Sequence, residues 1–218
     1  AASDVYKRQN KDLAEQVEGA KKAQAILEDS RTLSSAAALG EIDLATVRDL
    51  HFLTAKPFLY VFNSDEAVLT DEDKKAELRE LVAPADCVFL DAATEADLLE
   101  LDDEEAAELL ESVGQTEPGL QTLAKAGFAT LGLQTYLTAG PKEARAWTIH
   151  KGDTAPQAAG VIHTDFEKGF IKAEIVAFED LDELGSMAEA RAHGKVRQEG
   201  KDYVMADGDV VEFRFNVT

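Results

Sequence analysis

The sequence predicts an α/β protein in two parts, preceded by a helical segment. Between residues 54 and 132, short continuous apolar runs alternate with helical patterns, which is the order of strands and helices in an α/β sheet. After Gly132 the pattern changes to short alternating runs separated by turn residues, which is typical of a strand-rich unit. The length of 218 residues fits two such units, and 45% hydrophobic residues are enough to build their cores.

Charge and cysteine content narrow the class of protein. The net charge of −21 is concentrated in residues 63–132, which carry 4 basic and 19 acidic groups, whereas residues 133–218 carry 10 and 15. An acidic middle part repels nucleic acid, so we expect any RNA contact in the C-terminal part and no binding to DNA. The single Cys87 excludes an intramolecular disulfide, and neither a membrane-length apolar run nor a signal peptide is visible. We therefore expect a cytoplasmic protein without a membrane partner.

Residues 10–53 are predicted to form part of a helical arm. Leu13 and Val17 begin an apolar stripe at helical spacing, and a second helix is expected from Asp43. Residues 1–9 do not join smoothly to this pattern, and we interpret them as non-native. The apolar positions of the second helix are Leu44, Val47, Leu50 and Leu53.

Two short apolar runs predict neighbouring strands that are buried on both faces. Phe58–Phe62 is continuously apolar and aromatic, as in a parallel sheet, and Cys87–Leu90 is a second such run. Thr70 is expected to begin the helix between them, because Asp73 follows at a spacing close to that of a capping box. The expected buried stripe of that helix is Leu78, Leu81 and Val82.

The acidic run Glu100–Glu111 is interpreted as the solvated face of a helix. Its leucines lie mostly opposite its carboxylates, and no Asp-x-Asp-x-Asp-Gly loop accompanies it. The four histidines show no metal-ligand spacing with Cys87 or with one another. The sequence therefore predicts no metal site.

The last third of the chain predicts a β-grasp, ubiquitin-like order of elements. A hairpin is expected from residues 135–138 and 145–149, followed by a helix that Asp153 and Thr154 begin. The remaining expected elements are a strand over 170–178, a helix over 187–192, and a strand pair over 203–205 and 210–215.

A polar turn follows the first predicted strand at its carboxyl end, where open α/β sheets bind ligands. In P-loop nucleotide-binding proteins the equivalent turn reads guanine with an Asn amide and, three residues on, an Asp carboxylate. Here Asn63 is followed by Ser64 in place of the usual Lys and by Glu66 in place of that Asp. Because the Glu side chain is longer, specificity for guanine should be lost. Taken alone, these residues are equally those of an ordinary turn.

Five longer segments carry a resemblance to a known family. They are LHFLTAKPFLYVFNSDE (50–66), LDAATEADLLELDDEEAAELL (90–110), EPGLQTLAKAGFATLGLQTYLTAGPKEARAWTI (117–149), APQAAGVIHTDFEKGFIKAE (155–174) and KDYVMADGDVVEFRFNV (201–217). With these segments the chain resembles the Obg-like ATPases of the YchF type, and HTDFEKGF is the most specific of its motifs.

The resemblance implies a role for each part of the chain. Residues 10–53 would belong to the helical arm of the family, residues 54–132 to the C-terminal part of its P-loop nucleotide-binding sheet, and residues 133–218 to its TGS β-grasp domain. The implied ligands and partners of the intact protein are ATP, Mg²⁺ and the ribosome or ribosomal RNA.

The resemblance also implies the residues that read the base. Asn63 and Glu66 would favour the adenine of ATP, and Ser64 would supply a backbone contact. Ala92 and Ala93 fall where the family places its second base-contacting loop.

One departure from the family limits what this chain can do alone. No G-x-x-x-x-G-K-[ST] phosphate loop occurs in the sequence, and phosphoryl transfer depends on groups positioned around the phosphates. We therefore expect that this chain is the C-terminal part of such a protein. We also expect that this part alone contains no catalytic residues and binds neither ATP nor Mg²⁺ tightly. The alternative is a stand-alone β-grasp module that binds protein or RNA and has no nucleotide role.

Basic residues of the C-terminal part are candidates for a single face that contacts RNA beside its aromatic residues. Stacking on Trp147, Phe166 and Phe170 beside cations that follow the backbone is how single-stranded RNA is held. The alternative is a normal sheet surface with core aromatics. The candidate contact residues are Lys142, Arg145, Lys151, His163, Lys168 and Lys172.

The absence of a phosphate loop from the sequence predicts that the purified chain hydrolyses no ATP above a buffer blank. Phosphate release with and without Mg²⁺ measures this, and Glu66→Ala is the control variant. Mg²⁺-dependent release that disappears in Glu66→Ala would contradict the prediction.

Overall fold

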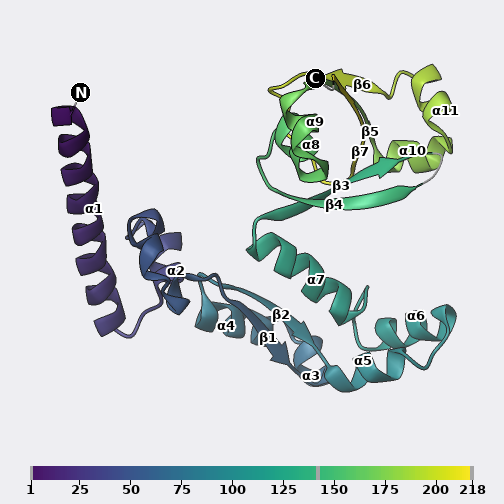
Figure 1. Ribbon diagram of the computed structural model, residues 1–218. Helices are drawn as coiled ribbons and strands as arrows, with labels where there is room; N and C mark the ends of the chain where they lie inside the picture. Colours follow the sequence, from purple (N-terminus) through teal and green to yellow (C-terminus); the bar gives the residue numbers. More distant parts are fainter. Residues whose placement is uncertain (1, 141–142, 217–218) are drawn as a thin grey trace. The chain divides into compact units, whose positions relative to one another are not determined.

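The computed structural model describes residues 2–140 and 143–216, and the chain forms two compact units, residues 1–130 and 131–218 (Figure 1). No helix among the described residues has the length and apolar content needed to cross a bilayer. The two units are described separately below.

The first unit begins with a long helix and a short one. Helix α1 (Ala2–Glu28) continues through most of the residues interpreted as non-native, and helix α2 (Leu33–Ala38) follows. Thr32 caps α2, since its hydroxyl oxygen accepts a hydrogen bond from the Ser35 N–H at 3.2 Å. A small core joins these helices to the following turn; its buried members are Ala23, Ile26, Leu33, Ala36, Ile42 and Val47.

The expected second helix of the arm is wrong in type. Asp43 does cap an element, accepting from the Ala45 N–H at 2.9 Å, but that element is the 3-10 helix η1 (Leu44–Leu50), followed by η2 (Leu53–Ala55). The physical reason is visible in the spacing. The apolar residues recur at every third position, which is the repeat of a 3-10 helix and not of an α-helix.

Two parallel strands form the small sheet of the first unit. Strand β1 (Leu59–Asn63) pairs with β2 (Asp86–Leu90) in a register that runs from Leu59 opposite Asp86 to Asn63 opposite Leu90. The prediction of neighbouring strands is confirmed, but burial of β1 on both faces is wrong. Tyr60 and Val61 are 40% and 46% exposed, because β2 is the single neighbouring strand of β1 within the described part of the chain.

Helices α3 (Glu66–Leu69) and α4 (Glu72–Val82) connect these strands, and their boundaries correct the sequence prediction. Thr70 ends α3, and Asp71 begins α4 by accepting from the Lys74 N–H at 2.9 Å. Leu81 of the expected buried stripe is 76% exposed, so the prediction is wrong at that position.

Most of the acidic run lies in α6 (Asp103–Ser112), which follows α5 (Ala92–Leu98), and α7 (Gly119–Thr130) completes the unit. Leu110 and Val113 are buried while the carboxylates of the run are exposed, as expected for a solvated helix face. Among the described residues no group of three or more His, Cys, Asp or Glu is placed to hold a metal ion.

The second unit is built on a five-stranded sheet in the order β4-β3-β7-β5-β6 (Figure 1). β3 and β4 form the expected antiparallel hairpin, and β7 lies in the centre, parallel to β3 and antiparallel to β5. The strands are β3 (Leu133–Ala139), β4 (Ala144–His150), β5 (Phe170–Ala177), β6 (Arg197–Glu199) and β7 (Asp209–Phe215).

The expected pairing of residues 203–205 with the last strand is wrong. Val204 makes an isolated bridge with Thr154, and β6, which the sequence did not indicate, pairs with β5 instead. The reason is that the Asp207-Gly208 turn is held by β3. The Asp207 carboxylate accepts from the Thr135 N–H at 2.7 Å, and the Gly208 N–H donates to the Thr135 carbonyl at 2.9 Å.

Helices cover both faces of this sheet (Figure 1). α8 (Ala155–Ile162) and α9 (Thr164–Lys168) lie on one face, and α10 (Phe178–Leu184) and α11 (Met187–Ala192) on the other. Tyr136 is fully buried under α8; its hydroxyl donates to the Ala158 carbonyl at 2.9 Å, and burial raises its pKa. Ile171 is exposed although Ala173 and Ile175, the next alternate positions of β5, are buried, because the pairing of β5 with β7 shifts register between Phe170 and Lys172.

The motif HTDFEKGF serves packing in this structure. His163 caps α9, with Nδ1 accepting from the Asp165 N–H, and the Phe166 ring stacks on Phe215 at 3.7 Å between centroids. A Cβ on Gly169 would lie 2.1 Å from the backbone oxygen of Asn216, so only glycine fits there.

Gly169→Ala should therefore destabilise the second unit by about 1–3 kcal/mol, because the clash is with backbone that cannot rotate away. Trp147 is the single tryptophan, so urea unfolding followed by its fluorescence reports on this unit. Gly200→Ala is the matched control, since a Cβ there has no neighbour within 4 Å in the described structure, and its effect should stay within about 0.5 kcal/mol. Equal effects of the two variants would contradict the packing argument.

Candidate functional site

The carboxyl ends of β1 and β2 bring the two predicted base-contacting segments together. Because the strands are parallel, residues 63–66 and 91–93 leave the sheet at the same edge. The Asn63 Oδ1 accepts a hydrogen bond from the Ala92 N–H at 3.0 Å, and the Ser64 N–H donates to the Leu90 carbonyl at 2.8 Å. Residues 29 positions apart in sequence therefore form one polar site.

The bond to Ala92 fixes the orientation of the Asn63 amide. A backbone N–H can only donate, so the group that faces Ala92 must be the amide oxygen. The NH₂ group of Asn63, which is exposed, is left to donate to a ligand. The site thus offers a hydrogen-bond donor at a defined position.

The two acidic residues of the turn have different surroundings. The Asp65 carboxylate caps α3 by accepting from the Val68 N–H at 3.2 Å. Glu66 is exposed at the first position of α3, and its carboxylate bonds to none of the residues that the structure describes. Of the two, Glu66 is the acceptor that remains for a ligand.

The second loop offers a small surface, and the backbone N–H groups of its two alanines are already engaged. The Asp91 carboxylate caps α5, accepting from the Ala93 N–H at 2.9 Å and from the Thr94 hydroxyl at 3.1 Å. The N–H groups of Ala92 and Ala93 are therefore both engaged, by Asn63 and Asp91. Both alanines are exposed, and their methyl side chains leave room beside Asn63.

Glu95 supports this loop from behind, and sequence reasoning missed it. Its carboxylate accepts from the N–H groups of Gly119 at 2.6 Å and Leu120 at 3.2 Å, which ties α5 to the start of α7. A Cβ on Gly119 would lie 2.7 Å from the Leu90 Cβ, so the helix approaches β2 closely. The signal in the sequence was Pro118-Gly119, a helix start without a local capping side chain, which requires an acceptor from elsewhere.

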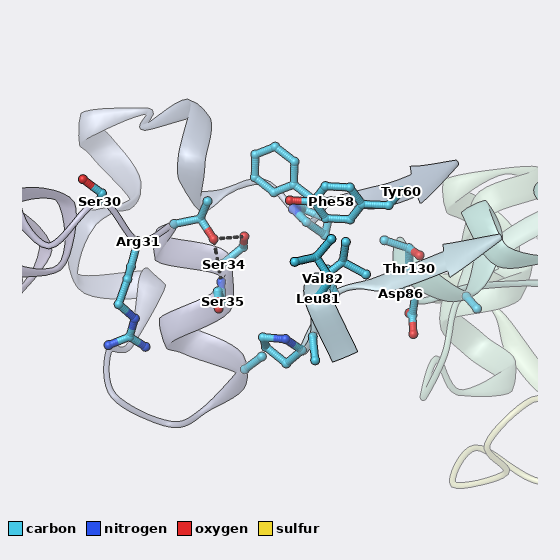
Figure 2. Close-up of a pocket in the computed structure, with 17 residues that line it drawn as sticks. Ser30, Arg31, Ser34, Ser35, Phe58, Tyr60, Leu81, Val82, Asp86 and Thr130 are labelled. Carbon is cyan, nitrogen blue, oxygen red and sulfur yellow. Dashed lines mark hydrogen bonds between the residues drawn. The ribbon is translucent and has the colours of Figure 1, made fainter. Parts of the chain in front are cut away.

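A cavity of about 580 Å³ lies at the opposite, amino ends of the two strands (Figure 2). Phe58 and Tyr60 stack there with ring centroids 6.4 Å apart. Arg31 points away from these rings and pairs with Glu41 through two hydrogen bonds, and the Thr130 Oγ1 has no partner among the described residues. None of the residues predicted to read the base lines this cavity.

The candidate RNA-contact residues do not form the single face that we expected. Lys142 lies outside the described residues. The guanidinium of Arg145 stacks over Trp147 at 4.1 Å on β4, and Lys151 follows that strand. His163 and Lys168 flank α9, at either end of the helix.

Lys172 lies on the opposite face of the sheet and is engaged by other groups. It donates to Gln198 at 3.1 Å and lies 3.7 Å from the carboxylate of Glu174. Glu174 also accepts from Arg191 at 2.8 Å, and this hydrogen bond lowers its pKa. The alternation of β5 places Lys172 and Glu174 away from the face that Trp147 occupies, so the expected shared face is wrong for Lys172.

Residues 133–216 match the profile of the YchF-GTPase_C family, described as "Protein of unknown function (DUF933)". The C-terminal unit belongs to the YchF-GTPase_C family. Similarity to YchF proteins extends upstream into the first unit. The "Ribosome-binding ATPase YchF" of Bacillus subtilis is 51% identical over 176 residues, which are 78% of this chain and 48% of that protein.

Two further relatives give the same result. The "Ribosome-binding ATPase YchF" of Escherichia coli O157:H7 is 48% identical over 192 residues, 85% of this chain and 53% of that protein. The human "Obg-like ATPase 1" is 46% identical over 171 residues, 76% and 43% of the two chains. The chain thus spans about half the length of the curated YchF relatives it matches.

The fold agrees with a solved YchF structure. The YchF GTPase of Schizosaccharomyces pombe superimposes with a TM-score of 0.65 at 34% identity, covering 89% of this chain and 55% of that one. A GTP-binding protein from Pyrococcus horikoshii, at 18% identity and a TM-score of 0.52, shares the fold alone. The mixed α/β architecture is that of YchF structures.

Removing the Glu95 carboxylate should loosen α7. Glu95→Ala leaves the N–H groups of Gly119 and Leu120 without their acceptor, which costs about 1–2 kcal/mol of local stability. Native-state hydrogen exchange of the α7 amides measures this opening free energy. Glu100→Ala is the control, because that exposed carboxylate bonds to no group in the described structure; equal protection in both variants would contradict the role of Glu95.

Proposed function

We propose that this chain is the C-terminal part of a ribosome-associated ATPase of the YchF type, and that its Asn63–Glu66 turn reads the adenine of ATP. The relatives named above as ribosome-binding ATPases support the class of function. Because the ribosome is a cytoplasmic assembly, the proposal also locates the protein there.

The hydrogen bond between Asn63 and Ala92 is the observation that carries this proposal. It holds the Asn63 amide with its NH₂ group outward, and N7 of a purine is an acceptor that matches such a donor. Adenine presents a 6-amino donor next to N7, and the unengaged Glu66 carboxylate is an acceptor in the same turn. Guanine presents the carbonyl oxygen O6 at that position, which a carboxylate repels.

The phosphates and Mg²⁺ require groups that this sequence does not contain. The described residues include no cluster of carboxylates placed for a cation, so the residues present do not fit Mg²⁺. In this proposal, binding of the base is the contribution of the first unit, and we derive no step of hydrolysis from it.

We further propose that the C-terminal unit is a TGS module of the β-grasp type. Two observations support this assignment. The strands lie in the order β4-β3-β7-β5-β6, and along the chain α8 connects β4 to β5. Contact with the ribosome would use the polar side chains on or next to β4 and α9, which are Arg145, Lys151, His163 and Lys168.

The test is an NMR titration of the chain with ATP, read at the amides of residues 63–66 and 91–93. Asn63→Asp keeps an oxygen that accepts from the Ala92 N–H but replaces the NH₂ donors with an acceptor. We expect this variant to bind ATP about tenfold more weakly while its loop geometry stays intact. Asn216→Asp makes the same change in charge in the other unit and should bind ATP like the unaltered chain.

Three outcomes would contradict the assignment of the base site. They are equal binding of ATP by Asn63→Asp and the unaltered chain, equal shifts of these amides by ATP and GTP, and no shift at the site at about 10 mM ATP, where even a weak site fills.

A further inference from the structure

Strand β4 forms an open edge of the five-stranded sheet. It pairs with β3 on one side and ends the strand order on the other, whereas the opposite edge, β6, has only three residues. β4 has seven residues without proline and a single charged side chain, Arg145. Natural edge strands that stay unpaired are usually shorter, bulged or more highly charged. The open edge of β4 has none of these features, so it is suited to pair with a further strand.

The hydrogen-bond pattern of the hairpin shows which backbone groups face outward. The Lys151 N–H donates to the Gly132 carbonyl and the Gly140 N–H to the Glu143 carbonyl. Because hydrogen-bonded pairs alternate in an antiparallel ladder, Ile149, Trp147 and Arg145 bond to β3, and the residues between them point away from it. These outward residues are Ala144, Ala146, Thr148 and His150.

Three of the four outward residues keep their backbone groups open. The His150 N–H donates to the Asp153 carboxylate at 2.8 Å, which closes that end of the edge. Ala144, Ala146 and Thr148 are exposed, and their N–H groups donate to nothing in residues 2–140 or 143–216. Their short side chains let another backbone approach to the spacing of a sheet.

We propose that β4 pairs antiparallel with β4 of a second copy of this chain, about a two-fold axis at Ala146. In that register Ala146 faces its own copy, and Ala144 faces Thr148 of the partner. All three open N–H groups of each protomer then find a carbonyl of the other protomer.

The side chains of β4 are complementary in this register. Arg145 of one protomer lies directly opposite Trp147 of the partner, on the face where the guanidinium already stacks on Trp147 of its own chain at 4.1 Å. Glu143 lies diagonal to Lys151 of the partner, which places opposite charges near each other.

A second copy fits this edge better than RNA does. Ala144, Ala146 and Thr148 each present one N–H and one C=O group along the open edge. Only the backbone of an extended peptide offers acceptors and donors in the matching order. The net charge of −21 on each copy opposes association. The dimer should therefore be weak at low salt and strengthen as salt screens this repulsion.

Cysteine cross-linking of the full chain tests the register. In a Cys87→Ser background, Ala146→Cys should form a disulfide-linked dimer on mild oxidation, since residues 146 face each other across the axis at about 5.5 Å between Cα atoms. Thr148→Cys is the matched control: its two copies lie four residues apart along the strands, so it should not cross-link to itself. A mixture of Ala144→Cys and Thr148→Cys chains should cross-link.

Sedimentation velocity at concentrations up to about 0.5 mM tests the hydrogen bonds. Ala146→Pro removes the outward N–H at the centre of the interface without removing a bond to β3, and should weaken association at least tenfold. Ala146→Thr keeps the N–H and should associate like the unaltered chain.

Four results would overturn the proposal. They are a monomer at every concentration and salt, equal association of Ala146→Pro and the unaltered chain, self-cross-linking of Thr148→Cys as strong as that of Ala146→Cys, and no cross-link in the mixture. If β4 instead binds an added peptide or RNA, the chain should stay monomeric at every concentration and salt, which also contradicts the proposal.

Discussion

The parallel pairing of β1 with β2 is the interaction on which the candidate site depends. Parallel strands end at the same edge of a sheet, so this ladder places Asn63 beside Ala92 although the two are 29 residues apart. Each polar group in the two loops then has a defined task. Asp65 and Asp91 cap helices, Asn63 joins the loops, and Glu66 alone keeps an unengaged carboxylate.

The second unit rests on the central position of β7. This strand joins the β3–β4 hairpin to β5, so both halves of the sheet depend on its register. The contact between Gly169 and Asn216 holds the end of that strand, which explains why HTDFEKGF, the most distinctive motif in the sequence, lies beside it. Within this motif His163 caps α9, Phe166 stacks on Phe215 and Gly169 leaves room for the Asn216 backbone, so these three residues serve packing.

Sequence patterns predicted the elements whose signal is local. The apolar runs of β1 and β2, the β3–β4 hairpin and the Thr154 cap of α8 can each be recognised from neighbouring residues, and each lies where it was predicted. The resemblance supplied the candidate site, because Asn-x-x-Glu alone is also an ordinary turn.

The errors arose where distant groups decide the structure. The Asp207-Gly208 turn bonds to β3, so no hairpin forms there, and Glu95 caps a helix that begins 24 residues later. The exposure of Tyr60 depends on how many strands flank β1. This is a property of the whole sheet, and the local apolar sequence does not predict it.

The half-buried Cys87 gives the small sheet a built-in reporter. Its backbone lies opposite Tyr60 in the ladder, and burial raises the pKa of its thiol, so the closed sheet keeps little of the reactive thiolate. A thiol reagent should therefore modify Cys87 more slowly in the closed sheet than in molecules in which β1 and β2 have separated. A substitution that increases the separation of the two strands should then raise the rate of that modification.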